Sequence, residues 1–183
     1  MGKMANDAYL IVLVGPPGSG KTTWARRNGH GAVHVSQDDL IDAITPFGFD
    51  HIYRPVYRDA EDAIARAALR DGHTVIVDRT NRTRAHRERW LRIAREAQCP
   101  AVAVVMSTSA AVCHERNAAR SGPRRLSPER MERMIAAFEA VGDDEGFAAV
   151  HVEDGEGTGV TLEEILSVSI KEQMSHEYCH EAR

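Results

Sequence analysis

The chain has 183 residues, of which 43% are hydrophobic and 27% charged, a composition typical of one soluble globular domain. No stretch stays apolar for the roughly 18 residues that a membrane-spanning helix needs, and residues 1–8 lack the apolar core of a signal peptide, so we expect a cytoplasmic protein. Three cysteines without short spacings argue against a disulfide framework and against a zinc site.

The formal net charge of −4 conceals an uneven distribution along the chain. Residues 79–95 hold seven arginines and one acid, whereas residues 139–164 hold nine acids and no lysine or arginine. The chain favours arginine over lysine, twenty to three, but this bias does not explain why the arginines cluster. A local cluster of cations predicts a polyanionic partner.

An apolar run at residues 9–14, Tyr-Leu-Ile-Val-Leu-Val, predicts a buried parallel strand, and residues 1–8 before it are expected to be flexible. The run leads into Gly-Pro-Pro-Gly-Ser-Gly-Lys-Thr at residues 15–22 and then into a helical stretch that ends near Gly29. This is the pattern G-x-x-x-x-G-K-[ST] in its required setting of strand, loop and helix. It predicts a phosphate-binding loop.

The residue types of this loop match that chemistry. Glycines let the backbone turn tightly and direct its N–H groups toward one point, and the following helix N-terminus adds partial positive charge. Lys21 is expected to reach the β- and γ-phosphates of ATP or another nucleoside triphosphate, and the Thr22 hydroxyl to bind Mg²⁺. The predicted nucleotide-binding residues of the loop are Gly15, Pro16, Pro17, Gly18, Ser19, Gly20, Lys21, Thr22 and Thr23.

A short second strand at residues 32–36 delivers Asp38 and Asp39 to its C-terminal end, where ligands bind in open α/β sheets. A short helix is expected over residues 39–44. Residues 45–57 combine prolines and a glycine with Phe49 and Tyr53, which predicts an aromatic-bearing loop without regular structure. Its aromatic side chains either stack on a base of an unpaired nucleotide or hold the loop itself in place.

The remaining chain alternates helical and strand patterns. Helices are expected over residues 58–70, from a cap at 81–83 to about 97, over 110–120, and from a cap at 127 to a point before 142; strands are expected over 74–77, 101–106 and 147–152. Thr161–Glu164 is a capping box that opens a last helix within the linker and tail of residues 153–183. The alternation predicts an α/β fold over residues 9–152, a three-layer P-loop domain with a parallel sheet of about five strands.

Four segments, taken in chain order, resemble the kinase domain of polynucleotide 5′-kinases, as in bacteriophage end-healing enzymes and bacterial end-repair proteins. They are the phosphate loop with the Thr-Trp-Ala-Arg after it, the pair Asp38-Asp39, the segment 77–81 (Val-Asp-Arg-Thr-Asn), and the segment 115–120 (Glu-Arg-Asn-Ala-Ala-Arg). The resemblance covers roughly residues 9–140. It implies an ATP-dependent kinase that phosphorylates a hydroxyl on nucleic acid, most directly the 5′-OH of a strand end in DNA or RNA.

The resemblance also implies roles for individual residues. Asp38 corresponds to the general base, which must lie within about 3 Å of the acceptor hydroxyl, whereas its alternative role is a helix cap; Asp39 is favoured as the cap. Arg120 corresponds to a lid arginine that contacts the transferring phosphate, and Arg116 to a second nucleotide contact. Asp78, at the end of the third strand, either organises Mg²⁺ as a Walker-B-type acid or makes a structural hydrogen bond to the phosphate loop.

Arg116 and Arg120 are four residues apart and therefore expected on one helix face, beside a break at residues 121–123 that predicts a mobile lid; the alternative is a solvated helix and loop. The candidate acceptor-binding residues are Arg79, Asn81, Arg82, Arg84, Phe49 and Tyr53. Arg87, Arg92 and Arg95 lie farther along the same predicted helix and are expected on a solvated face.

One position departs from the family pattern. The family commonly carries an arginine three residues after the base, where this chain has Ile41. The acceptor therefore stays open at this point. A hydroxymethylated pyrimidine within DNA, such as 5-hydroxymethyluracil, and a small metabolite are the alternative acceptors, and an ATP-hydrolysing switch is the alternative without an acceptor.

Overall fold

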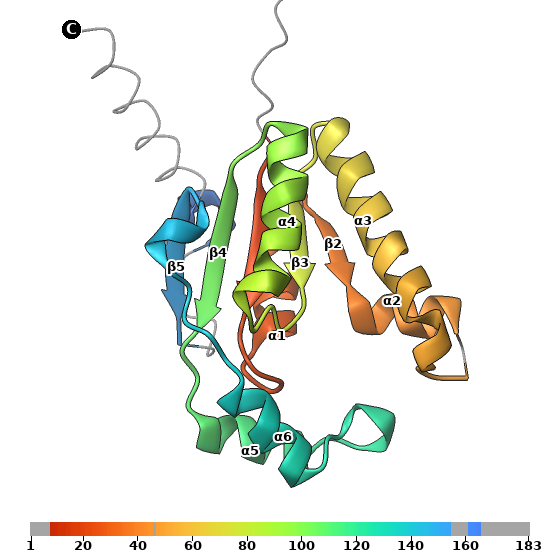
Figure 1. Cartoon of the computed structure of the whole chain (residues 1–183). Coiled ribbons are helices and arrows are strands. Elements are labelled where there is room, and N and C mark those ends of the chain that lie inside the picture. Colours follow the sequence, from red (N-terminus) through yellow and green to blue (C-terminus); the bar gives the residue numbers. More distant parts are fainter. Residues whose placement is uncertain (1–7, 46, 155–160, 166–183) are drawn as a thin grey trace, which may run out of the picture.

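The computed structural model describes residues 8–45, 47–154 and 161–165, so the predictions for the remaining N-terminal and C-terminal residues lie outside it. Its centre is a parallel sheet with the strand order β2-β3-β1-β4-β5 (Figure 1). The strands are β1 (Leu10–Val14), β2 (Val33–Ser36), β3 (Val75–Asp78), β4 (Ala101–Met106) and β5 (Ala149–Glu153). The predicted α/β fold with a five-stranded parallel sheet is confirmed.

The central strand β1 is buried along its whole length, as its continuous apolar sequence predicts. Alternate residues serve two cores on opposite faces of the sheet. Leu10, Val12 and Val14 pack with Trp90 of the helix α4 (Arg84–Ala97), whereas Ile11 and Leu13 pack with Trp24 of the helix α1 (Lys21–Asn28). Figure 1 shows α4 and α1 on the two sides of the sheet, which makes the three layers.

The α-helices are α1 (Lys21–Asn28), α2 (Gln37–Ile44), α3 (Arg54–Arg70), α4 (Arg84–Ala97), α5 (Ala110–Ala118) and α6 (Pro128–Ala136), and the short 3₁₀ turns are η1 (His51–Tyr53), η2 (Gly122–Arg124) and η3 (Asp143–Glu145). The prediction that residues 45–57 have no regular structure is wrong at their C-terminal end. There α3 begins four residues before the expected start, because Pro55 suits the first turn of a helix. In the described part of the chain, no helix is long and apolar enough to cross a membrane.

Hydroxyl side chains cap most of these helices. Thr83 and Ser127 accept backbone hydrogen bonds at the starts of α4 and α6, as predicted, and Ser109 does so at the start of α5. At α2 the cap is Ser36, whose Oγ accepts from the backbone N of Asp39 at 3.3 Å, so the predicted cap role of Asp39 is wrong. The first turn of α2 therefore begins two residues earlier than expected and includes Asp38.

The capping box at Thr161 is confirmed within the described residues. The backbone N of Thr161 donates to Glu164 Oε2 at 2.8 Å, and the backbone N of Glu164 donates to Thr161 Oγ1 at 3.3 Å. The short helical segment that follows contributes Leu162 and Ile165 to the core that also contains Trp24.

The C-terminal ends of β1, β2 and β3 lie on one edge of the sheet, together with the phosphate loop and the segment of α5, η2 and α6 (Figure 1). In open α/β sheets, ligands bind at this edge. The candidate site is therefore expected where these segments meet.

Candidate active site

A cleft of about 1100 Å³ opens at this edge of the sheet. Most of the predicted site residues line it: Pro17, Gly18, Gly20, Lys21, Thr22, Thr23, Asp38, Phe49, Asp78, Arg79, Asn81, Arg82, Arg116 and Arg120. Gly15, Pro16 and Ser19 belong to the loop but do not face the cleft, and neither do Tyr53 and Arg84. The sequence pattern thus brings four separate segments to one cavity.

Close contacts explain two glycines of the phosphate loop. A Cβ atom on Gly15 would lie 2.5 Å from Ser19 Oγ and 2.9 Å from Met106 Cβ. Gly18 has a φ of +83°, and a Cβ there would lie 2.7 Å from the backbone O of Cys113 in α5. A side chain at position 15 would displace the side chains of Ser19 and Met106, and one at position 18 would displace the backbone of Cys113. The loop is therefore held tightly between β4 and α5.

Lys21 is buried at the centre of this loop. Its Nζ donates hydrogen bonds to the backbone O of Gly15 at 2.9 Å and to that of Pro16 at 2.8 Å. Burial lowers the pKa of Lys21 to about 8. The ammonium group therefore lies where an anionic phosphate compensates the charge that burial disfavours.

The affinity for ATP is expected to fall as pH rises above 8, by up to about tenfold per pH unit. Above its pKa the free Lys21 is neutral, so binding of a phosphate must be accompanied by uptake of a proton. The terminal phosphate itself loses its second proton near pH 6, and its charge is constant in this range. Titration calorimetry in buffers of different ionisation enthalpy measures the uptake.

The control for this prediction is Lys21→Gln, which removes the titrating group. We expect weak ATP binding that does not change with pH above 8. An affinity of the wild type that stays constant from pH 8 upward would contradict the lowered pKa of Lys21.

Thr22 and Asp78 form the polar centre of the cleft next to the loop. Thr22 Oγ1 donates to Asp78 Oδ2 at 2.6 Å, and His34 Nε2 lies 3.3 Å from the same oxygen. Although burial raises the pKa of Asp78, the contact with His34, the hydrogen bond from Thr22 and the charge of Lys21 hold it below its ordinary value. The predicted hydrogen bond between Asp78 and the loop is thus present.

The same pair fits a magnesium ion. A hydroxyl and an ionised carboxylate are oxygen donors of the kind that Mg²⁺ prefers, and they lie beside the loop that is built for phosphates. His34 was not among the predicted residues. It could have been found from strand alternation, because His34 and Ser36 share one face of β2 and Ser36 pairs with Asp78.

Asp38 stands opposite the loop in the first turn of α2, exposed to the cleft. Ile41 and Asp42, three and four residues later, line the cleft with it, as residues on one helix face do. Asp39 does not line the cleft, and its carboxylate lies 3.9 Å from Arg124 Nη2. Among the described residues, Asp38 is thus the carboxylate that lines the cleft from the first turn of α2.

Arg116 and Arg120 both line the cleft, but α5 ends at Ala118, so the prediction that they share one helix face is wrong. The cause is the buried Asn117. Its Nδ2 donates to the backbone O of Leu126 at 2.9 Å, and its Oδ1 accepts from the backbone N of Leu126 at 3.0 Å. These two bonds close a loop of residues 118–125, which carries Arg120.

The longer segment of residues 108–125 is attached to neighbouring parts of the site on both sides. On one side, Thr108 Oγ1 donates to the backbone O of Ser19 at 2.9 Å, and Arg116 Nη1 donates to that of Gly18 at 3.4 Å. On the other, Arg124 pairs with Asp42 of α2 across the cleft. The structure therefore shows an arginine-bearing loop at the cleft between the helices α5 and α6, and it includes the predicted break at residues 121–123.

Two predicted acceptor-binding residues need correction. Asn81 is buried, its Nδ2 donates to the backbone O of Leu13 at 2.8 Å, and its Oδ1 accepts from Trp90 Nε1 at 3.0 Å, so its side chain maintains the fold. Arg84 points away from the cleft and donates to Asp144 Oδ2 at 2.9 Å. The acceptor roles predicted for Asn81 and Arg84 are therefore not supported.

Further arginines line the cleft. Arg79 Nη1 donates to the buried Glu61 at 2.5 Å, and Arg82 has a buried Nε atom without a hydrogen-bond partner among the described residues. The basic residues of α3 and α4 that line the cleft but were not among the predicted site residues are Arg54, Arg58, His86 and Arg89. Their positions depend on how α3 and α4 pack together, which no local pattern indicates.

Comparisons with known proteins agree with this architecture. Residues 10–141 match the family AAA_33, described as an AAA domain. A search of curated proteins found no match.

Among solved structures, a putative kinase from Chloroflexus aurantiacus aligns with a TM-score of 0.71 at 18% identity, over 94% of this chain and 99% of that chain. Mycobacterium tuberculosis APS kinase in complex with AMPPNP and APS aligns with a TM-score of 0.56 at 16% identity, over 90% of this chain and 96% of that chain. A chain of the Pnkp1/Rnl/Hen1 complex aligns with a TM-score of 0.54 at 24% identity, over 70% of this chain and 44% of that chain. At these identities the three structures share the fold. Since the family match spans residues 10–141 of 183, the protein belongs to the AAA_33 family, and its P-loop domain has the fold seen in kinases.

Proposed function

We propose that the protein is an ATP-dependent kinase that transfers the γ-phosphate to a hydroxyl on nucleic acid, most directly the 5′-OH of a polynucleotide. The observation that carries the proposal is the charge of the acceptor side of the cleft. Beyond Asp38 that side is lined by the cations Arg54, Arg58, Arg79, Arg82 and Arg89 and by the imidazole of His86. An acceptor that carries phosphate groups complements such a surface.

The electrostatics of His86 supports this view. Burial and the charges of Arg82, Arg79 and Arg58 lower the pKa of His86. On this side the buried Glu61 accepts hydrogen bonds from Arg79 and Arg89, and Asp62 accepts one from Arg89. Positive charge therefore remains in excess at the place where the acceptor enters.

Each residue has a definite task in this reaction. Asp38 accepts the proton of the acceptor hydroxyl, whose oxygen forms a bond to the γ-phosphorus while the bond from that phosphorus to the β–γ bridging oxygen breaks. Lys21 binds the β- and γ-phosphates, and Arg120 stabilises the charge of the transferring group. When bound by Thr22 and Asp78, Mg²⁺ supplies further neutralisation of phosphate charge.

A small-metabolite kinase is the second candidate. One observation favours it: the contact of Arg124 with Asp42 joins the two sides of the cleft close to Asp38, which limits the room for a polymer. The solved structure of APS kinase shows that this fold occurs in a kinase crystallised with a small acceptor.

The deciding experiment is incubation with ATP labelled at the γ-phosphate and a panel of acceptors. The panel contains 5′-OH DNA, 5′-OH RNA, duplex DNA with hydroxymethylated bases, nucleosides and small phosphorylated alcohols. Label in a 5′-OH strand supports the proposal. Label in small alcohols alone supports the metabolite kinase, and release of free phosphate alone supports a switch.

Binding of a 5′-OH oligonucleotide is expected to weaken with salt, and Arg82→Ala should lower the slope of log K against log salt by about 0.7 to 0.9, the share of one phosphate contact. The matched control is Arg84→Ala, which removes the same charge from a side chain that does not line the cleft. Fluorescence anisotropy at several salt concentrations gives both slopes. Equal changes in the two variants would show that only overall charge matters.

A further inference from the structure

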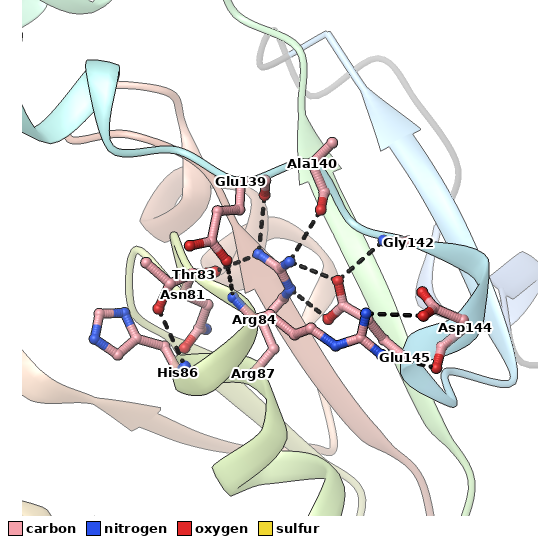
Figure 2. Close-up of polar contacts among 10 residues, drawn as sticks. All are labelled: Asn81, Thr83, Arg84, His86, Arg87, Glu139, Ala140, Gly142, Asp144 and Glu145. Carbon is pink, nitrogen blue, oxygen red and sulfur yellow. Dashed lines mark hydrogen bonds and ion pairs between the residues drawn. The ribbon is translucent and has the colours of Figure 1, made fainter.

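The side chain of Arg87 is buried in the protein interior. Arg87 lies on α4, where the sequence predicts a solvated face, yet its side chain is 0% exposed, so that prediction is wrong. Its Nε and Nη2 donate to the two carboxylate oxygens of Glu145 at 2.7 and 2.6 Å (Figure 2). Three further bonds lead to the backbone O atoms of Asn81, Glu139 and Ala140 at 3.1, 3.1 and 3.0 Å. All five donors of the guanidinium are therefore used.

These bonds fix the backbone on both sides of Arg82. The carbonyl of Asn81, which belongs to the peptide group before Arg82, accepts directly from Arg87. The carbonyl after it, that of Arg82 itself, accepts from the backbone N of Glu139 at 2.8 Å. Arg87 holds the carbonyl of Glu139 in turn. One buried side chain thus fastens the turn after β3 to the segment after α6.

The arrangement leaves Arg82 as the charged side chain of this turn that is free to meet a ligand. Asn81, with an unusual φ of 44°, uses its amide in the fold, and Arg84 points to Asp144. Arg82 lines the cleft, and its buried Nε lacks a hydrogen-bond partner among the described residues. A donor left unpaired in a buried position is costly unless a ligand completes it.

The carboxylate of Glu145, like the guanidinium of Arg87, is held in one orientation by several hydrogen bonds. Its Oε1 accepts from the backbone N of Gly142 at 2.9 Å as well as from Arg87, and both side chains are excluded from solvent. A buried pair of this kind is weak evidence for stability, because the cost of removing two charges from water offsets their attraction. A role in holding the neighbouring backbone in place explains the presence of the Arg87–Glu145 pair better.

We propose that Arg87 and Glu145 are positioning residues that hold Arg82 in the orientation in which it binds a phosphate group of the acceptor. Neither residue touches the acceptor. The proposal rests on the proposed function, since it assigns Arg82 to the acceptor side of the same cleft. It predicts an effect on acceptor binding that is separate from ATP binding.

The test is Glu145→Gln, which keeps the volume of the side chain but places an amide NH₂ against the donors of Arg87. We expect KM for the acceptor and Kd for a labelled 5′-OH oligonucleotide to rise about tenfold, the loss of one charge-assisted hydrogen bond. KM for ATP should not change. The matched control is Asp144→Asn in the same turn, whose partner Arg84 is exposed, and it should behave as the wild type.

The double variant Arg82→Ala/Glu145→Gln separates positioning from mere folding. If Glu145 acts through Arg82, the double variant should bind the oligonucleotide no more weakly than Arg82→Ala alone. Additive losses, or a lower melting temperature with unchanged acceptor affinity, would overturn the proposal. Glu145→Asp, which keeps the charge but not the reach, provides the same comparison if the glutamine variant does not fold.

The two proposals fail in different ways. A wild type that binds the oligonucleotide but does not phosphorylate it overturns the proposed function, while the comparison of binding constants among the variants still decides the role of Glu145. A wild type that phosphorylates the oligonucleotide, with equal acceptor constants in Glu145→Gln and Asp144→Asn, overturns the positioning role alone.

Discussion

Arg120→Ala is expected to lower kcat by about 10³- to 10⁵-fold, the effect of an arginine that stabilises the transferring phosphoryl group. Arg120 lies on the loop that Asn117 closes, lines the cleft, and carries an exposed side chain. A contact made only in the transition state lowers kcat without raising KM. KM for ATP should therefore change little. Steady-state kinetics with saturating acceptor gives both constants.

Two variants on the same segment serve as controls. Arg116→Ala should mainly raise KM for ATP, because the Arg116 side chain donates to the backbone O of Gly18 in the phosphate loop. Arg125→Ala removes a charge from the same loop at a position that does not line the cleft, and its effect should be small. Equal small losses in all three variants would show that the loop is a general basic surface without a catalytic arginine.

The phosphate loop could be predicted from the sequence because its determinants are local. The apolar run of β1, the glycines and Lys21 follow one another in the sequence. The strand is explained by burial, the glycines by close backbone packing, and Lys21 by its place in a phosphate-binding loop. The same holds for the parallel sheet, whose strands are short apolar runs between helices. Local pattern and global fold agree in this half of the molecule.

The environment of Arg87 could not be predicted from local sequence patterns. The position of Arg87 is three, four and seven residues before Trp90, Leu91 and Ala94, so helical spacing places it on the buried face of α4. The charge of Arg87 instead predicted a solvent-exposed side chain. The partner that makes burial possible, Glu145, lies 58 residues away in sequence. Only the folded arrangement brings the two together.

The lid region differs from the prediction for a similar reason. The helical pattern of residues 110–120 continues to Arg120, but the side chain of Asn117 substitutes for a backbone partner of Leu126, nine residues later. α5 ends at Ala118 and Arg120 begins a loop. An asparagine carries both a donor and an acceptor, so it can pair with both backbone groups of one residue. Its position in a predicted helix gave no sign of this role.

Asp38→Asn is expected to lower the rate of phosphoryl transfer by about 10²- to 10⁴-fold, the range for loss of a general base. Asparagine keeps the size of the side chain and its place in the first turn of α2, but it cannot accept the proton of the acceptor hydroxyl. Because the partner of Asp38 is the acceptor, the Kd for ATP should stay near that of the wild type. Lys21→Ala should reduce both transfer and ATP binding, since Lys21 lies within the phosphate loop itself.

Asp39→Asn provides the matched control, because it removes the same charge from the same helical turn at a position that does not face the cleft. Any effect of charge on α2 or on its dipole appears in both variants, whereas loss of the base appears only at Asp38. Single-turnover measurements with ATP bound in advance separate the chemical step from binding. Near-wild-type turnover of Asp38→Asn, or equal losses at Asp38 and Asp39, would contradict the assignment of the base, and Asp42, which shares the cleft face of α2, would then be the next carboxylate to replace.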